Sequence, residues 1–314
     1  GFANSVRKGD RGRDAKLAQE WLCYHGFSTT VDGVFGAATE AAVRSFQTSR
    51  GLPASGIVES STQGALLSPL VSVQQPIVPG SRPLRDLTVA YARQHLAQHP
   101  VEIGGQNCGP WVRLYMGGNE GPQWPWCAGF ATLILRQACQ TLSVAMPHPY
   151  AFGCDYLAGI AQAKGRLLRP ASDADLDAIQ PGFLFLVRKA TNTWEHVGIV
   201  EEIRDGVLTT IEGNTNDRGS AEGYEVCRRM RSAQFLLFSK SRLSDRMAFG
   251  HQVTGNYRTA PPFAEGKPPR GLILHHLDWL DESGVQCQSP RTARSANAMS
   301  ARATCSGCSP IRLC

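Results

Sequence analysis

Apolar residues recur at helical spacing in the first part of the chain. Leu17 and Trp21 mark one amphipathic helix, and Val43 and Phe46 mark a second. A glycine-rich turn precedes each helix, and glycine adopts positive φ without steric cost. The pattern predicts a small helical unit in which Trp21, Phe35 and Phe46 fill one core.

A third short helix is expected next, followed by a proline-rich segment. Ser61 or Thr62 can cap this helix, which we expect to run through Leu67. Residues 69–83 combine prolines with Ser and Gln, a composition typical of a semi-extended linker. The pattern therefore predicts a three-helix domain over residues 1–68 and then a linker.

From residue 84 the pattern is helical at first and later alternates in the manner of strands. The helical patterns cover residues 87–96, 111–116, 127–138 and 151–163. The strand patterns cover residues 183–187, 197–200, 207–211 and 235–238. Helices followed by a meander of strands predict an α+β domain with an antiparallel sheet over residues 84–240.

The last segment, residues 241–314, loses this periodicity. Its proline pairs and its stretch rich in Ser, Arg and Ala are typical of disorder. It contains nine Lys or Arg and five Asp or Glu, and so holds most of the net charge of +6. We expect a basic, low-order tail after a nearly neutral chain.

Composition narrows the classes of partner. A basic protein favours anionic partners, but the near neutrality of the first 240 residues argues against nucleic acid as the main ligand. No apolar run approaches the roughly 20 residues that span a bilayer, so no membrane partner is expected. The chain begins at Gly1 without a signal-peptide pattern, which says little about export if the start is truncated.

Metal and cofactor sites are not expected. Cys305 and Cys308 form a lone CxxC pair, without the second pair that would complete a zinc site. Asp173, Asp175 and Asp177 alternate, but the Gly and distal Glu of a calcium loop are missing.

The candidate chemistry begins with a thiol and an imidazole. Cys127 directly precedes a strong helical pattern, and a thiol at a helix N-terminus is held near positive charge, which favours the thiolate. Ala128 and Gly129 are expected to keep the rim open for substrate. His196 starts a strand pattern, and Gly198 on the same face suggests free space beside the ring.

A predicted hairpin brings polar groups to this imidazole. Asp205 and Gly206 form a turn signature, so that residue 204 opposes residue 207. Counting along the strands places His196 opposite Thr215, or opposite Asn214 if the register shifts by one residue. Glu212 and Asn214 lie on one face of their strand, and an oxygen of either can accept the imidazole N–H.

Residues 5–68 resemble the three-helix peptidoglycan-binding domain. The residues that carry the resemblance are 11–17, 32–36, Thr39, 42–43, 46–47, 51–52 and 56–58. Two positions depart from the family pattern, at Ser55 and Glu59, where relatives often have Asp and Gly. The resemblance implies that peptidoglycan is the partner of this domain.

The second domain resembles the CHAP family of cysteine, histidine-dependent amidohydrolases/peptidases. The matching segments are 107–112, Tyr115, 126–130, 181–182, 196–200 and 211–215. The resemblance implies a papain-like α+β fold in which Cys127 is the nucleophile, His196 the base and Glu212 the group that orients it. Asn214 matches a fourth polar position of some members. Phe183 replaces a common Asp, so we expect a local packing change there.

Together the two resemblances imply an enzyme that cleaves an amide bond of peptidoglycan. The bond is either that of an N-acetylmuramoyl-L-alanine amidase or a peptide bond of the stem or cross-bridge. A monomer is expected, located outside the cell, at the wall, or encoded by a phage. One alternative is a non-catalytic wall-binding protein with a degenerate second domain, and others are a nucleic-acid-binding protein that uses the tail and an amidase of small conjugates.

Overall fold

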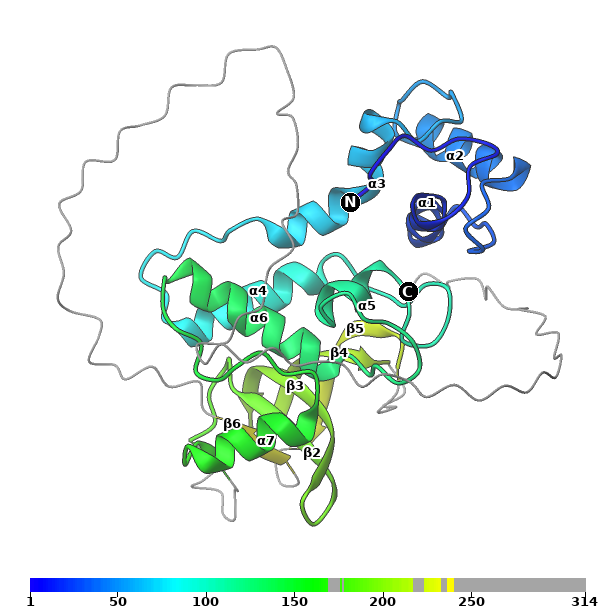
Figure 1. Cartoon of the computed structure of the whole chain (residues 1–314). Helices are drawn as coiled ribbons and strands as arrows, with labels where there is room; N and C mark the ends of the chain where they lie inside the picture. Colours follow the sequence, from blue (N-terminus) through cyan, green and yellow to red (C-terminus); the bar gives the residue numbers. More distant parts are fainter. Residues whose placement is uncertain (169–175, 177, 217–222, 233–235, 240–314) are drawn as a thin grey trace, which may run out of the picture. The chain divides into compact units, whose positions relative to one another are not determined.

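The computed structural model describes residues 1–168, 176, 178–216, 223–232 and 236–239 (Figure 1). The predicted tail over residues 241–314 and the Asp173, Asp175 and Asp177 series lie outside the described residues. Among the residues that are described, no helix is both long enough and apolar enough to cross a membrane.

Three helices form the N-terminal unit. They are α1 (Arg13–Tyr24), α2 (Ala37–Ser49) and α3 (Ser60–Gln74). Trp21, Phe35 and Phe46 are buried together in its core, as the sequence predicts.

Helix α3 differs from its prediction at both ends. Its N-cap is Glu59, and the predicted cap Thr62 lies inside the first turn, where its hydroxyl accepts a hydrogen bond from Gln47. The helix passes Leu67 and runs through Pro69 to Gln74, so the first six residues of the predicted linker are helical.

Side chains that lie close in space donate hydrogen bonds to the carbonyls in the last part of α3, and these bonds explain why the helix continues to Gln74. Ser68 Oγ donates to the carbonyl of Ala65, which Pro69 cannot bond because it lacks an N–H. Gln137 Nε2 donates to the carbonyl of Val73 at 2.7 Å, and Gln94 donates to that of Ser72. The last carbonyls of α3 are thus satisfied by side chains far along the chain, which local composition does not reveal.

Four further helices follow the N-terminal unit. They are α4 (Leu84–Leu96), α5 (Pro110–Tyr115), α6 (Cys127–Thr141) and α7 (Cys154–Ala163). Each agrees with its predicted segment to within three residues at either end. Figure 1 shows α4 beside α6, and residues of both helices join one hydrophobic core.

One antiparallel sheet of six strands completes the fold, in the order β1-β6-β2-β3-β4-β5. The strands are β1 (Leu167–Leu168), β2 (Leu184–Ala190), β3 (Thr193–Arg204), β4 (Val207–Thr215), β5 (Glu225–Ser232) and β6 (Leu236–Ser239). Helices combined with an antiparallel sheet confirm the mixed α+β class. The division of the chain at residues 68, 83 and 240 stays a prediction.

The sheet separates two groups of buried side chains. Val197 and Ile199 of β3 pack in the larger core with the helices, whereas Val200 packs with Phe183 and Phe185 in a smaller cluster. This division follows the alternation that the sequence predicts for β3. Phe183, the departure from the family pattern, is therefore an apolar member of the smaller cluster.

A bulge sets the register of the central hairpin. Asp205 and Gly206 adopt φ values of 50° and 72°, and Arg204 pairs with Val207 as predicted. The pairing shifts between Val200 and Glu202, so that Ile199 lies opposite Ile211. If the strands continue in that register, Asn214 lies opposite His196. This pairing is the alternative to Thr215 that the sequence allows.

Glycine at position 129 allows α6 to begin against the end of α5, and we expect its substitution to be destabilising. A Cβ there would collide with the carbonyl oxygen of Tyr115 and approach Met116 Sδ to 2.5 Å. Gly129→Ala should lower the free energy of unfolding by about 1–3 kcal/mol, as for other overpacked cores. Gly159→Ala in α7 is the control, because its Cβ would meet nothing within 4 Å, and it should be neutral or stabilise by up to about 1 kcal/mol. Urea denaturation compares the two, and equal effects would contradict the close packing at Gly129.

Candidate active site

Cys127 is the first residue of α6, and the residue is 3% exposed. A hydrogen bond from Cys154 and interactions with His196 and the Val197 N–H hold the pKa of Cys127 well below its usual value, although burial opposes this. The N-terminal end of α6 adds positive potential in the same direction. The thiolate is therefore the favoured form of this side chain.

The small residues near Cys127 have a different role from the expected one. Ala128 and Gly129 are buried, so they do not form an open rim. The space beside Gly198 is also filled, because a Cβ there would lie 2.6 Å from Phe185 Cε1 and 2.8 Å from Glu212 Cγ. These positions instead permit the close packing that holds the site together.

His196 lies on β3 between the thiol and a carboxylate. Its Nε2–H donates to Glu212 Oε2 at 2.8 Å, and the ring is 1% exposed. Its Nδ1 is buried, and besides Glu212 the ring has a polar interaction with the side chain of Cys127. Burial lowers the pKa of His196, but Cys127 and Glu212 raise it more, to about 9. The imidazole is therefore held in its protonated form near neutral pH.

Glu212 of β4 is a fully buried carboxylate with several donors. Besides His196, it accepts hydrogen bonds from Thr210 Oγ1 at 2.5 Å and from Arg231 Nε and Nη2, both at 2.6 Å. Burial raises the pKa of Glu212, but the hydrogen bonds from Arg231 and His196 outweigh this effect and lower the pKa to about 2. The carboxylate is charged at neutral pH, and each of its oxygens is satisfied.

Asn214, the fourth predicted residue, is also buried in this region. Its backbone has a φ of 55°, which non-glycine residues seldom adopt. Neither polar atom of its side-chain amide has a hydrogen-bond partner among the described residues. The preceding Gly213 lets β4 approach α6, because a Cβ there would lie 2.8 Å from Phe130 and Trp126.

Two residues of the site were missed from sequence. Arg231 lies on β5, whose inward positions Cys227, Arg229 and Arg231 lack the apolar character that marks a half-buried strand. Its guanidinium pairs with Glu212 and lies 5.2 Å from the ring centroid of Phe185. Cys154 starts α7, and its Sγ is 3.6 Å from that of Cys127. The two cysteines are 27 residues apart in the sequence, and no local pattern indicates that their sulfur atoms lie close together.

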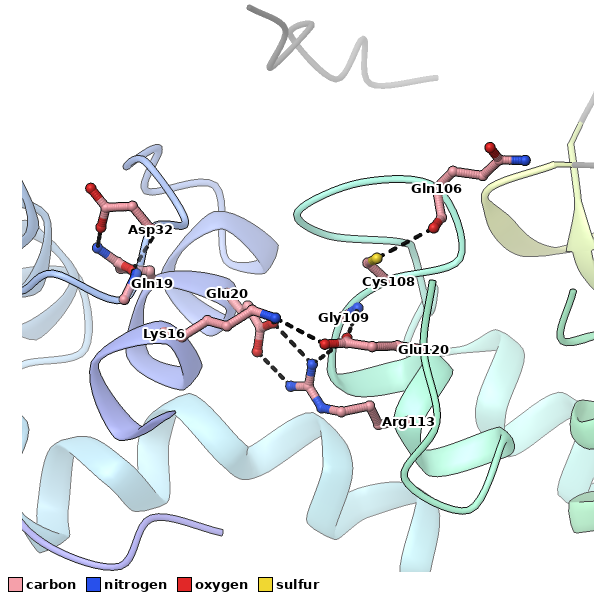
Figure 2. Close-up of polar contacts among 10 residues, drawn as sticks. Lys16, Gln19, Glu20, Asp32, Gln106, Cys108, Gly109, Arg113 and Glu120 are labelled. Carbon is pink, nitrogen blue, oxygen red and sulfur yellow. Dashed lines mark hydrogen bonds and ion pairs between the residues drawn. The ribbon is translucent and has the colours of Figure 1, made fainter. Parts of the chain in front are cut away.

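A network of charges holds the loop that leads to Cys127 (Figure 2). Glu120 in this loop accepts hydrogen bonds from the Gly109 N–H at 2.9 Å, from Lys16 Nζ at 2.8 Å and from Arg113 Nη1 at 2.5 Å. Arg113 also binds both carboxylate oxygens of Glu20, a buried residue of α1. The N-terminal helices thus contact the segment that positions the thiol.

Gln123 of the loop before α6 is exposed, and its amide lies beside Gly121. Among the described residues, no group of three or more His, Cys, Asp or Glu could hold a metal ion.

Loss of Arg231 should leave the charge of Glu212 buried without its strongest partner. We expect Arg231→Met to lower the free energy of unfolding at pH 7 by about 3 kcal/mol, typical of a broken buried pair. The loss should shrink in acid, where the carboxyl group can become protonated. Arg228→Met is the matched control, because its partner Glu201 keeps Arg93 at 2.7 Å. Equal losses in the two variants would contradict the role given to Arg231.

The comparisons with known proteins concern the N-terminal helices. Residues 11–66 match the family described as "Putative peptidoglycan binding domain". A spore cortex-lytic enzyme of Bacillus cereus is 43% identical over 68 residues, which are 21% of this chain and 26% of the relative. The chain therefore spans about a quarter of the length of this curated relative.

Two solved structures also match parts of the chain. The SleB N-terminal domain is 38% identical, with 22% of this chain and 96% of that chain covered and a TM-score of 0.21. The endolysin of the Burkholderia AP3 phage is 27% identical, with 27% and 38% covered and a TM-score of 0.20. On the family match over residues 11–66, the N-terminal helices form a peptidoglycan-binding domain.

Proposed function

We propose that this protein is a peptidoglycan hydrolase that cleaves an amide bond through Cys127. One observation carries the proposal. The Nε2 of His196 is held by Glu212 at 2.8 Å, which leaves Nδ1 for a thiol at the start of a helix. This is the nucleophile, base and orienting group that acyl transfer needs. The peptidoglycan-binding domain supports the wall polymer as substrate.

The reaction would follow the charges of the site. The Cys127 thiolate attacks the amide carbonyl, and the backbone N–H of Cys127 is a candidate donor to the developing oxyanion. Protonated His196 then gives its proton to the leaving amine. The neutral imidazole activates water, which hydrolyses the thioester and restores the thiolate.

Glu212 and Asn214 would act at different points. Glu212 fixes the orientation and tautomer of His196 and stabilises its positive charge. The amide of Asn214 has no partner in the described chain, so its oxygen and nitrogen are available to polar groups of the substrate or to water. We assign the second domain to the papain-like CHAP family on this set of residues, with Cys127, His196 and Glu212 in the catalytic roles.

The N-terminal domain would hold the enzyme on its polymer. Binding to an insoluble substrate raises the local concentration of the catalytic group without any change in the site itself. Muramoyl–L-alanine amides and peptide bonds of the stem or cross-bridge are both candidate substrates. A monomer acting at the cell wall or outside the cell fits this role.

Removal of the thiol should separate wall binding from hydrolysis. We expect Cys127→Ala to sediment with purified sacculi as the parent does, but to solubilise them at least about 10³-fold more slowly. Cys139→Ala is the control, because this buried cysteine lies three turns further along α6, about 18 Å from Cys127 along the helix axis. Solubilisation by Cys127→Ala at the parental rate would rule out cysteine catalysis. If the parent and Cys127→Ala both bind sacculi and neither hydrolyses them, a non-catalytic wall-binding protein would be favoured instead.

The activity should fall at alkaline pH. The pKa of His196 is raised to about 9, so above that pH the imidazole loses the proton that the leaving amine needs. The value of kcat/KM should decrease about tenfold per pH unit beyond this point. Because Glu212 raises the pKa of His196, Glu212→Gln should move the alkaline limb to lower pH. A limb that does not move would show that another group controls it.

A further inference from the structure

The thiol of Cys154 lies beside the nucleophile, and it takes part in no step of the mechanism above. The two sulfur atoms are 3.6 Å apart, and the side chains come from the first residues of two different helices, α6 and α7. Cys127 is 3% exposed and Cys154 is 8% exposed. The pair is thus shielded from bulk solvent, and a small oxidant that reaches Cys127 also reaches Cys154.

We propose that Cys127 and Cys154 form a reversible disulfide that switches the hydrolase off when a hydroperoxide is present. A disulfide has an S–S length of about 2.05 Å, so the sulfurs need to approach by about 1.5 Å. Rotation of the two side chains supplies a movement of this size. The effect on activity rests on the proposed function, but the disulfide itself does not.

The chemistry proceeds in two balanced steps. The Cys127 thiolate attacks one oxygen of hydrogen peroxide, the O–O bond breaks, and the departing hydroxide takes up a proton to give water and a sulfenic acid. The Cys154 sulfur then attacks the Cys127 sulfur, and the S–O bond breaks. The departing hydroxide takes the proton of Cys154 as a second water, and a dithiol later reduces the disulfide by exchange.

The charges of the pair suit this division of roles. The hydrogen bond between the two sulfurs lowers the pKa of Cys127 and raises that of Cys154, so the first is the thiolate and the second its proton donor. The thiolate is the form that reacts with peroxide. The remaining buried cysteine of α6 differs, since burial raises the pKa of Cys139 to about 11.

A peptide map of the full chain tests the disulfide directly. Trypsin places Cys127 in the peptide 114–136, whereas Cys154 shares the peptide 137–164 with Cys139. The experiment therefore uses the Cys139→Ala variant, in which each peptide holds one cysteine. The protein is treated with limiting hydrogen peroxide, alkylated, digested without reduction and examined by mass spectrometry, and solubilisation of sacculi is measured in parallel.

We expect peptides 114–136 and 137–164 to be joined. Activity should fall by the fraction of Cys127 found in the disulfide, and dithiothreitol should restore it. In Cys139→Ala/Cys154→Ser, peroxide should instead carry Cys127 to the sulfinic acid, and the lost fraction should not return. Each variant is compared with its own untreated activity.

Two results would overturn the proposal. The first is oxidation of Cys127 to sulfinic acid without the joined peptides in the protein that has Cys154. The second is formation of the joined peptides with no matching loss of an activity that depends on Cys127. If the protein hydrolyses no sacculi at all, the joined peptides still report on the thiol pair, so failure of the proposed function is distinguished from failure of the switch.

Discussion

The buried carboxylate of Glu212 is the constraint on which the site depends. A charge with 0% exposure is stable only when hydrogen bonds and opposite charge replace water. Arg231, Thr210 and His196 supply these partners at 2.5–2.8 Å. Gly198 leaves the room that the stem of Glu212 needs. Because Glu212 takes one nitrogen of His196, the orientation of the ring is fixed, and the other nitrogen is left for the thiol.

The position of the thiol depends on close packing at two glycines and on ion pairs that hold the loop before it. Gly129 lets α6 start against the end of α5, and Gly213 lets β4 pack directly on the side chains of Phe130 and Trp126. The loop before α6 is held by Glu120 and Arg113, which contact the N-terminal helices through Lys16 and Glu20. The peptidoglycan-binding domain and the proposed nucleophile are thus joined by a continuous set of contacts.

Sequence patterns predicted the parts of this site that are local. Asp205 and Gly206 determine the hairpin turn, and the start of α6 at Cys127 follows from the helical pattern after a Pro-Trp loop. The turn left two registers open and did not decide between them, and the contacts of Glu201 at the bulge come from Arg93 and Arg228, which are distant in sequence. The positions of Arg231 and Cys154 likewise depend on strand order and helix packing. The helical pattern over residues 151–163 predicts the helix of Cys154 but not the side chains that this helix contacts.

The central claim is that Cys127 and His196 form a thiolate–imidazolium pair, and the pH dependence of alkylation tests it most directly. The rate of reaction of Cys127 with iodoacetamide is measured from peptide 114–136 between pH 5 and pH 10. The account predicts rapid alkylation already in the acidic range, far below the ordinary thiol pKa of about 8.5. Alkylation that begins only near that pKa, as for an isolated thiol, would contradict it.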